Sequence, residues 1–96
     1  MIHVVKCKHT YFEQVVTGAK KFEVRNNDRN YQPGDIFIMQ EIEDKDRPGV
    51  PVVYTGRFIV CKISYMLENF EGLAPGFVAF TIDRELNVTR TLGGLK

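Results

Sequence analysis

The stretch "TYFEQVVTGAKKFEVR", residues 10–25, decides the fold because its hydrophobic period changes halfway along. In its first half, apolar side chains recur at the spacing of one helical stripe. They are Tyr11, Phe12, Val15 and Val16. Thr10 and Glu13 match the S/T-x-x-E capping box, and Gly18 is the usual kind of residue to end a helix. The sequence therefore predicts a two-turn helix that starts at Thr10 and lies on another element.

The second half of this stretch, "KFEVR", alternates apolar and charged residues, as a half-buried strand does. We expect Phe22 and Val24 on the core face of this strand, and Glu23 and Arg25 on the opposite face. Lys20 stands just before the strand with the opposite parity. It can therefore join Glu23 and Arg25 only by reaching across or through a local bulge.

The rest of the chain predicts strands separated by turns. Further strands are expected at residues 2–7, 35–42, about 52–66 and 77–83. Gly56 indicates a bulge, residues 67–76 a loop with one helical turn, and residues 84–96 a sixth strand or a docked arm. The expected fold is a single domain, residues 1–96. It is mainly β with one or two short helices (α+β), curled into a small mixed barrel of five to six strands.

Two segments between the strands carry turn-forming or charged residues. Residues 26–35, "NNDRNYQPGD", combine Asn, Asp and Pro-Gly, all of which favour turns. Residues 43–51, "EDKDRPGVP", predict an exposed hairpin loop. The acidic residues in and beside that loop are expected to be solvated and to repel phosphate. They are Glu41, Glu43, Asp44 and Asp46.

Composition limits where a charged ligand can bind. A chain of 96 residues with 44% hydrophobic content suits one globular domain. Its formal net charge of +1 excludes nucleic-acid binding by overall basicity, so any site for an anion must be local. The sequence contains neither a signal-peptide run nor the roughly 20 apolar residues of a membrane span, which predicts a cytoplasmic protein without a membrane segment.

Cys7 and Cys61 are too few for a disulfide scaffold and lie among apolar residues, so we expect two buried thiols. Zinc is the alternative, because His3, Cys7 and His9 would share one face of a strand and Cys61 could join them. The chain lacks the C-x2-4-C pair that usually marks a structural zinc site. The sequence therefore predicts no metal and no cofactor.

The run "GAKKFEVR", residues 18–25, matches the signature G-x-K-x-x-E-x-R, and through it the chain resembles the ASCH (activating signal cointegrator homology) domain of the PUA-like superfamily. With "YFEQVVTGAKKFEVRNNDR", "QPGD", "YTGR" and "PGFVAFTI", the chain is similar to a bacterial and phage branch described only as a domain of unknown function. The resemblance covers roughly residues 3–82 and leaves 84–96 as a C-terminal extension. It implies a PUA-like barrel whose cleft, beside the helix, binds RNA or a nucleotide.

The resemblance also leaves an enzymatic function open. Some ASCH proteins hydrolyse the amide of acetylated cytidine with a lysine, a threonine and a glutamate. Lys20 matches the lysine, whereas Glu23 stands at the threonine position. Glu68 and Glu71 lie in the loop where the glutamate is expected. An amidohydrolase would therefore use Lys20 and Glu23 as catalytic residues.

Our first interpretation is a binding module that holds RNA or a modified nucleotide in a local basic cleft. The expected ligand-binding residues are Lys20, Glu23, Arg25, Arg29 and Arg57. Arg25 would offer a forked donor to a phosphate or a base edge, and the bulge at Gly56 would aim Arg57 away from the regular pleat. Tyr54 and Tyr65 could stack on bases or be half-buried barrel residues. The alternative for the charged residues is a solvated surface.

A third interpretation is a module that binds another protein through the tail. Its basis is a set of apolar side chains that would need a partner unless they fold back. They are Leu86, Val88, Leu92 and Leu95.

Overall fold

The described part of the chain contains six strands and one helix, joined by loops. The computed structural model describes residues 1–45, 47–84 and 90–91. The elements are β1 (Ile2–Lys8), α1 (His9–Val16), β2 (Phe22–Asn26), β3 (Ile36–Ile42), β4 (Tyr54–Glu68), β5 (Phe77–Arg84) and β6 (Arg90–Thr91). The prediction of a mainly β fold with a short helix is confirmed.

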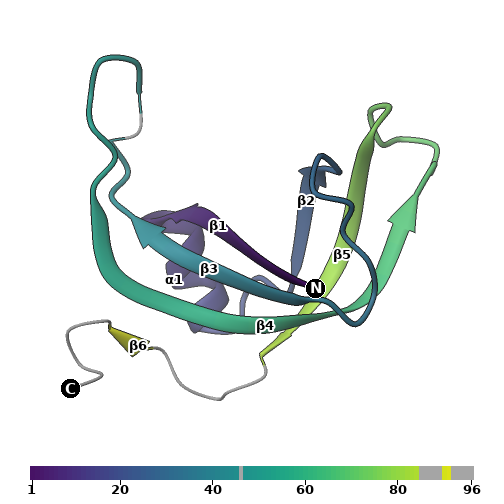
Figure 1. The fold of residues 1–96 in the computed structure, drawn as a ribbon, viewed down its shortest axis with the longest axis horizontal. Helices are drawn as coiled ribbons and strands as arrows, with labels where there is room; N and C mark the ends of the chain where they lie inside the picture. The colour runs from purple at the N-terminus through teal and green to yellow at the C-terminus, as the bar shows by residue number, and fades with distance from the viewer. Residues whose placement is uncertain (46, 85–89, 92–96) are drawn as a thin grey trace.

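The five longer strands form one sheet in the order β1-β3-β4-β5-β2, which curls into a half-barrel (Figure 1). β1 and β3 pair in parallel, and the other pairs are antiparallel. The 15-residue β4 pairs with β3 through its first half and with β5 through its second half. Because β4 belongs to both halves, its curvature turns the sheet back on itself. β1 and β2 become the two edges of the half-barrel.

The bulge predicted at Gly56 is confirmed. Gln40 of β3 lies opposite Phe58 of β4, whereas Ile42 lies opposite Tyr54, so β4 carries extra residues between these pairs. Gly56 has a φ of +92°, a conformation that favours glycine. This irregularity re-aims the neighbouring side chains, a point that matters for Arg57 below.

The core lies between the inner face of the sheet and α1. The sheet contributes buried side chains from β1, β3, β4 and β5. They are Val5, Cys7, Phe37, Met39, Ile59, Cys61, Ile63, Val78, Phe80 and Ile82. Phe12 and Val15 of α1 are buried against them, whereas Tyr11 is half exposed. Half of the predicted helical stripe is thus in the core, and Tyr11 is free to face solvent.

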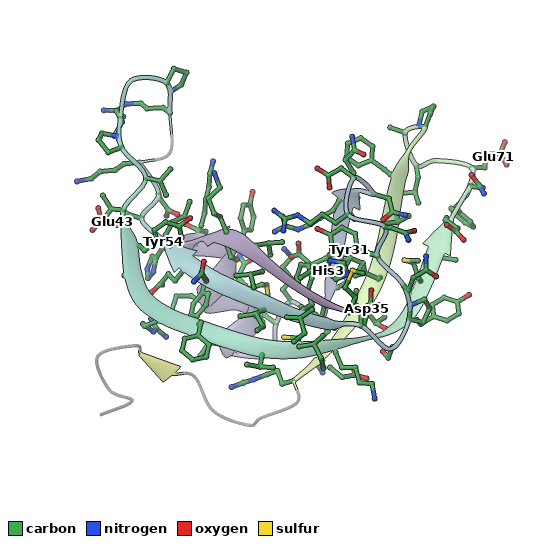
Figure 2. All side chains as sticks on the ribbon, viewed as in Figure 1. His3, Tyr31, Asp35, Glu43, Tyr54 and Glu71 are labelled. Atoms are coloured by element: carbon green, nitrogen blue, oxygen red, sulfur yellow. The ribbon has the colours of Figure 1, made fainter. Side chains whose placement is uncertain are left out.

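The loop between β2 and β3 adds an aromatic ring to this core. Tyr31 is only 1% exposed, and its ring centroid lies 4.7 Å from that of His3, 5.7 Å from Phe37 and 5.2 Å from Phe80. His3 Nε2 lies 2.7 Å from an Asp35 carboxylate oxygen, and Figure 2 shows His3, Tyr31 and Asp35 gathered together. The segment predicted only as turns is therefore also a structural part of the core.

The predicted capping box is wrong. α1 begins at His9, one residue earlier than expected, and Lys8 precedes it without a side-chain capping bond. The Thr10 hydroxyl donates to Asp44 at 2.5 Å, and the Glu13 carboxylate pairs with Arg57. The two side chains thus bond to Asp44 in the loop after β3 and to Arg57 of β4 instead of to the helix start. The end of the helix agrees with the sequence, because Gly18 follows it with a φ of +85°.

Of the predictions for the later loop and the tail, the helical turn is wrong and the sixth strand is confirmed. β4 extends to Glu68, and residues 69–76 form turns without the helical turn expected there. A sixth strand is confirmed as Arg90–Thr91, which pairs with β4 at Arg57 and Phe58. The apolar residues proposed to bind a partner lie outside the described residues.

Within the described part of the chain, no helix is long and apolar enough to cross a membrane.

Candidate functional site

A cleft of about 600 Å³ opens between the two edges of the half-barrel. One wall is formed by the end of β1 and the other by β2, with Tyr11 of α1 and the loop after β2 completing the lining. The site predicted from residues 18–29 thus lies where the sheet fails to close. We call this space the cleft.

Strand β2 presents the opposite face from the one predicted. Glu23 is 3% exposed, whereas Phe22 and Val24 are about half exposed. In the register of β2 with β5, Glu23 lies opposite the buried Phe80, and Val24 lies opposite Ala79. The charged face of β2 therefore points inward, and its apolar face points out. Two cations pair with the buried Glu23 carboxylate and offset part of the cost of burying it.

Glu23 holds Lys20 and Arg25 at the same time. Lys20 Nζ donates to Oε1 at 2.6 Å, and Arg25 Nε donates to Oε2 at 2.8 Å. Lys20 reaches Glu23 from the loop before β2, where its backbone N–H donates to Gln14 at the end of α1 at 2.9 Å. The parity problem raised by the sequence is solved by this loop, and no bulge is needed. One buried carboxylate therefore fixes two cationic groups beside the cleft.

The Lys20 ammonium also lies near two aromatic rings. It is 5.0 Å from the centroid of Tyr11 and 5.9 Å from that of Phe22. These distances are within the range of cation–π attraction. Both rings are about half exposed, so the cationic group is flanked by apolar surface open to solvent.

Arg25 and Arg29 reach from the β2 side to the free edge of β1. Arg25 Nη2 donates to the Lys6 carbonyl oxygen at 3.1 Å, and Arg29 Nη1 donates to the Val4 carbonyl oxygen at 2.9 Å. Both guanidinium groups still line the cleft. Of the predicted ligand-binding residues, the structure therefore brings Lys20, Glu23, Arg25 and Arg29 together.

Arg57, the fifth predicted ligand-binding residue, does not line the cleft. Its Nη1 donates to Glu13 at 2.7 Å, lies 3.5 Å from Glu41, and its guanidinium carbon is 5.0 Å from the Phe12 ring centroid. The bulge at Gly56 aims Arg57 toward α1. Arg57 lines other hollows of the surface but not the cleft.

Glu41 is the centre of this second polar group, although the sequence placed it among solvated acidic residues. It is 2% exposed and accepts hydrogen bonds from the Thr55 hydroxyl at 2.6 Å and from His9 Nδ1 at 2.7 Å. Burial alone would raise the pKa of Glu41. The bonds from Thr55 and His9, with the nearby charge of Arg57, outweigh burial and lower that pKa below its ordinary value.

Comparison with known proteins gives the family. A family model described as a domain of unknown function, DUF3850, matches residues 2–82. The chain belongs to this family. Residues 2–82 include both walls of the cleft and the Glu41 group. The description of the DUF3850 family names no ligand, so a function can be inferred only from the residues of the cleft.

A phage protein is also similar to this DUF3850 chain. The "Uncharacterized 12.9 kDa protein in GpA 3'region" of Escherichia phage P2 is 40% identical over 63 residues, which is 66% of this chain and 51% of the phage protein. The chain thus spans about half the length of that relative. This similarity agrees with the expected likeness to phage proteins.

The cysteines and histidines do not form the zinc site considered as an alternative. Cys7 and Cys61 are buried free thiols in this DUF3850 fold, and burial raises their pKa to about 11 and about 12 respectively. His3 bonds to Asp35 inside the core, whereas His9 bonds to Glu41 at the start of α1. Each histidine therefore has its own carboxylate partner.

One other group has potential metal ligands. The ligand atoms of His9, Glu13 and Glu41 lie within 4.8 Å of one another. Arg57 bonds to Glu13 and lies 3.5 Å from Glu41, so it already supplies positive charge there. We therefore assign no metal to these three residues.

The His9–Glu41 pair predicts a pH dependence of stability. The hydrogen bond to Glu41 raises the pKa of His9 above its ordinary 6.5, and the charges of Glu41, Glu13 and Asp44 act in the same direction. A pKa raised by folding stabilises the fold fully below the unfolded value, and this contribution is lost as pH rises through the folded value. The excess stability of wild type over His9→Gln should therefore be largest at about pH 5.5 and shrink toward alkaline pH.

Urea unfolding of both proteins across this pH range measures the difference. At about pH 5.5 Glu41 remains charged, because folding lowers its pKa from the ordinary 4.5. A Glu41→Gln variant should lose the same pH dependence. A difference between wild type and His9→Gln that stays constant with pH would show that the pair does not titrate as the contact requires.

Proposed function

We propose that the cleft binds RNA or a nucleotide. The observation that carries this proposal is the local charge of the cleft within a chain whose formal net charge is only +1. The cleft lining contains five cationic side chains, Lys6, Lys8, Lys20, Arg25 and Arg29, and two carboxylates, Glu23 and Asp28. Such a local excess attracts phosphate groups without making the whole protein basic.

Exposed rings in the same cleft support a nucleic-acid ligand over a simple inorganic anion. Phe22 and Tyr11 expose about half of their surface and both line the cleft. Bases of single-stranded RNA stack on such rings, and arginine adds forked donors to phosphate oxygens. The resemblance to ASCH and other PUA-like domains supports the same proposal.

The cationic residues would have different roles. Lys20 and Arg25 are fixed by Glu23, so they would orient a ligand. Lys6 and Lys8 are exposed on β1 and form no ion pair within the described residues. These two would act mainly as phosphate attractants, which makes them suitable for a test that leaves the fold intact.

A Lys6→Gln/Lys8→Gln variant should bind a single-stranded RNA octamer about tenfold more weakly than wild type at low salt. Each phosphate contact of a single strand contributes about 0.7 to the slope of log affinity against log salt, so the slope should fall by about 1.4. Fluorescence anisotropy at several salt concentrations measures both quantities. Lys62→Gln is the matched control, because Lys62 is exposed on β4 and does not line the cleft.

Two results would contradict the proposal. One is the absence of binding to RNA and to free nucleotides by the wild-type protein. The other is a loss of affinity in the Lys62→Gln control that is as large, per charge removed, as in the double variant, which would mean that overall charge and not the cleft is responsible.

A second candidate function is amide hydrolysis of an acylated nucleoside. The observation that favours it is the 2.6 Å contact of Lys20 Nζ with Glu23 inside the cleft, an amine beside a carboxylate. The reaction would consume water and release acetate and cytidine from acetylcytidine. Chromatography of acetylcytidine incubated with wild type and Lys20→Ala would test it. Unchanged substrate after hours with wild type at high concentration would exclude this activity.

A further inference from the structure

A second hollow continues from the cleft across the edge strand β1. It has a volume of about 420 Å³, and the lining residues that it does not share with the cleft are Val4, Val5, Gln40, Ile42, Val52 and Tyr54. The hollow and the cleft share four side chains, Lys6, Lys8, Arg25 and Arg29. We call these four residues the basic boundary, because they line both spaces and separate their apolar parts.

We propose, on the basis of the function proposed above, that the ligand is single-stranded RNA of at least two nucleotides that occupies both spaces. The phosphate that links the two nucleotides would lie on the basic boundary. One base would stack in the cleft on Phe22, and the next would stack in the second hollow on Tyr54. Tyr54 is thereby assigned as the second base platform.

Tyr54 has the properties that this role requires. It is 53% exposed, although it starts a strand and lies opposite the buried Ile42 of β3. Figure 2 shows Tyr54 at the end of the sheet near Glu43, away from Tyr31 beside the cleft. Tyr54 lines the second hollow and does not line the cleft. Within the proposal, Tyr54 would therefore serve a ligand that extends from the cleft into the second hollow.

The arrangement of charge and rings favours a single strand over a duplex. Exposed rings can stack only on bases that are unpaired and splayed apart. The order along the surface is ring, cationic group, ring, which matches the order base, phosphate, base. A mononucleotide would use one ring and part of the basic boundary, and it would leave the second hollow empty.

The experiment compares adenosine monophosphate with the 5′-phosphorylated dinucleotide pApA by calorimetry. The dinucleotide should bind wild type about tenfold more tightly, since base stacking on an aromatic side chain contributes of that order. Tyr54→Ala should reduce pApA affinity to the level of the mononucleotide and leave mononucleotide affinity unchanged. Tyr54→Phe should restore the dinucleotide preference because it keeps the ring.

Controls separate stacking from charge and from the proposed function itself. Tyr65→Ala removes another exposed tyrosine of β4 that lines neither space, and it should leave both affinities unchanged. If pApA binds wild type no better than the mononucleotide, or Tyr54→Ala keeps the dinucleotide preference, the second platform is excluded, whereas mononucleotide binding in the same experiment would still support the cleft. If neither probe binds, the inference and the proposed function fail together.

Discussion

Replacing Tyr31 with alanine is expected to lower the free energy of unfolding by about 3–5 kcal/mol, the usual cost of deleting a large buried aromatic ring. Tyr31 is 1% exposed and its ring contacts those of His3, Phe37 and Phe80. Removing it would leave a void between the two halves of the sheet, because Phe37 belongs to β3 and Phe80 to β5. Urea denaturation monitored by circular dichroism measures the loss.

Tyr31→Phe is the matched control for this prediction. It keeps the ring contacts and removes only the hydroxyl, so the change should be below about 1 kcal/mol. A loss below about 1 kcal/mol for Tyr31→Ala as well would mean that the ring is not part of the core. A large loss for Tyr31→Phe would instead assign the stability to the hydroxyl.

Glu23→Gln should lower the free energy of unfolding by about 2–4 kcal/mol. The substitution keeps the size of the side chain but leaves Lys20 and Arg25 without a counter-charge. Removing one partner of a fully buried ion pair costs about 3–5 kcal/mol, and the partial exposure of both cations reduces this figure. Thermal and urea unfolding in moderate salt measure the effect.

A double-mutant cycle of Glu23 and Arg25 is the control for this prediction. If Glu23 acts through its cations, Glu23→Gln should cost clearly less in an Arg25→Gln background than in wild type. Glu68→Gln, at the exposed end of β4, should have almost no effect. Equal costs of Glu23→Gln in both backgrounds would show that burial of the glutamate side chain, and not its charge, supports the fold.

The number of strands and their positions could be predicted because they depend on local patterns. Alternation and turn residues marked the strands, and Gly56 marked the bulge. The meeting of Lys20, Glu23 and Arg25 also followed from short sequence separation. These features require no knowledge of how distant parts of the chain pack.

The face of β2 could not be predicted, because alternation separates two faces without saying which one is inside. The usual assumption buries Phe22 and Val24 and exposes Glu23. In this half-barrel β2 is an edge strand, so its outer side chains remain half exposed while a neutralised carboxylate occupies the inside. Burial of Glu23 depends on cations from the preceding loop and from its own strand, which the pattern of β2 alone does not reveal.

Long-range partners explain the remaining errors. Thr10 and Glu13 have the spacing of a capping box, but Asp44 and Arg57 compete for them from residues more than thirty positions away. Glu41 likewise looks like part of an acidic loop until His9 and Thr55 are seen beside it. These contacts join residues that are distant in the sequence, so a local sequence pattern does not predict them.

The bonds from Arg25 and Arg29 to the carbonyl groups of Lys6 and Val4 also change what the edge of β1 offers to another strand. An unpaired strand edge such as β1 is a template onto which a strand of another molecule can add. Here two side chains occupy acceptors that an incoming strand would need. A ligand that draws these guanidinium groups away would uncover the template. On the proposed function, ligand binding and the protection of this strand edge would therefore involve the same two arginines.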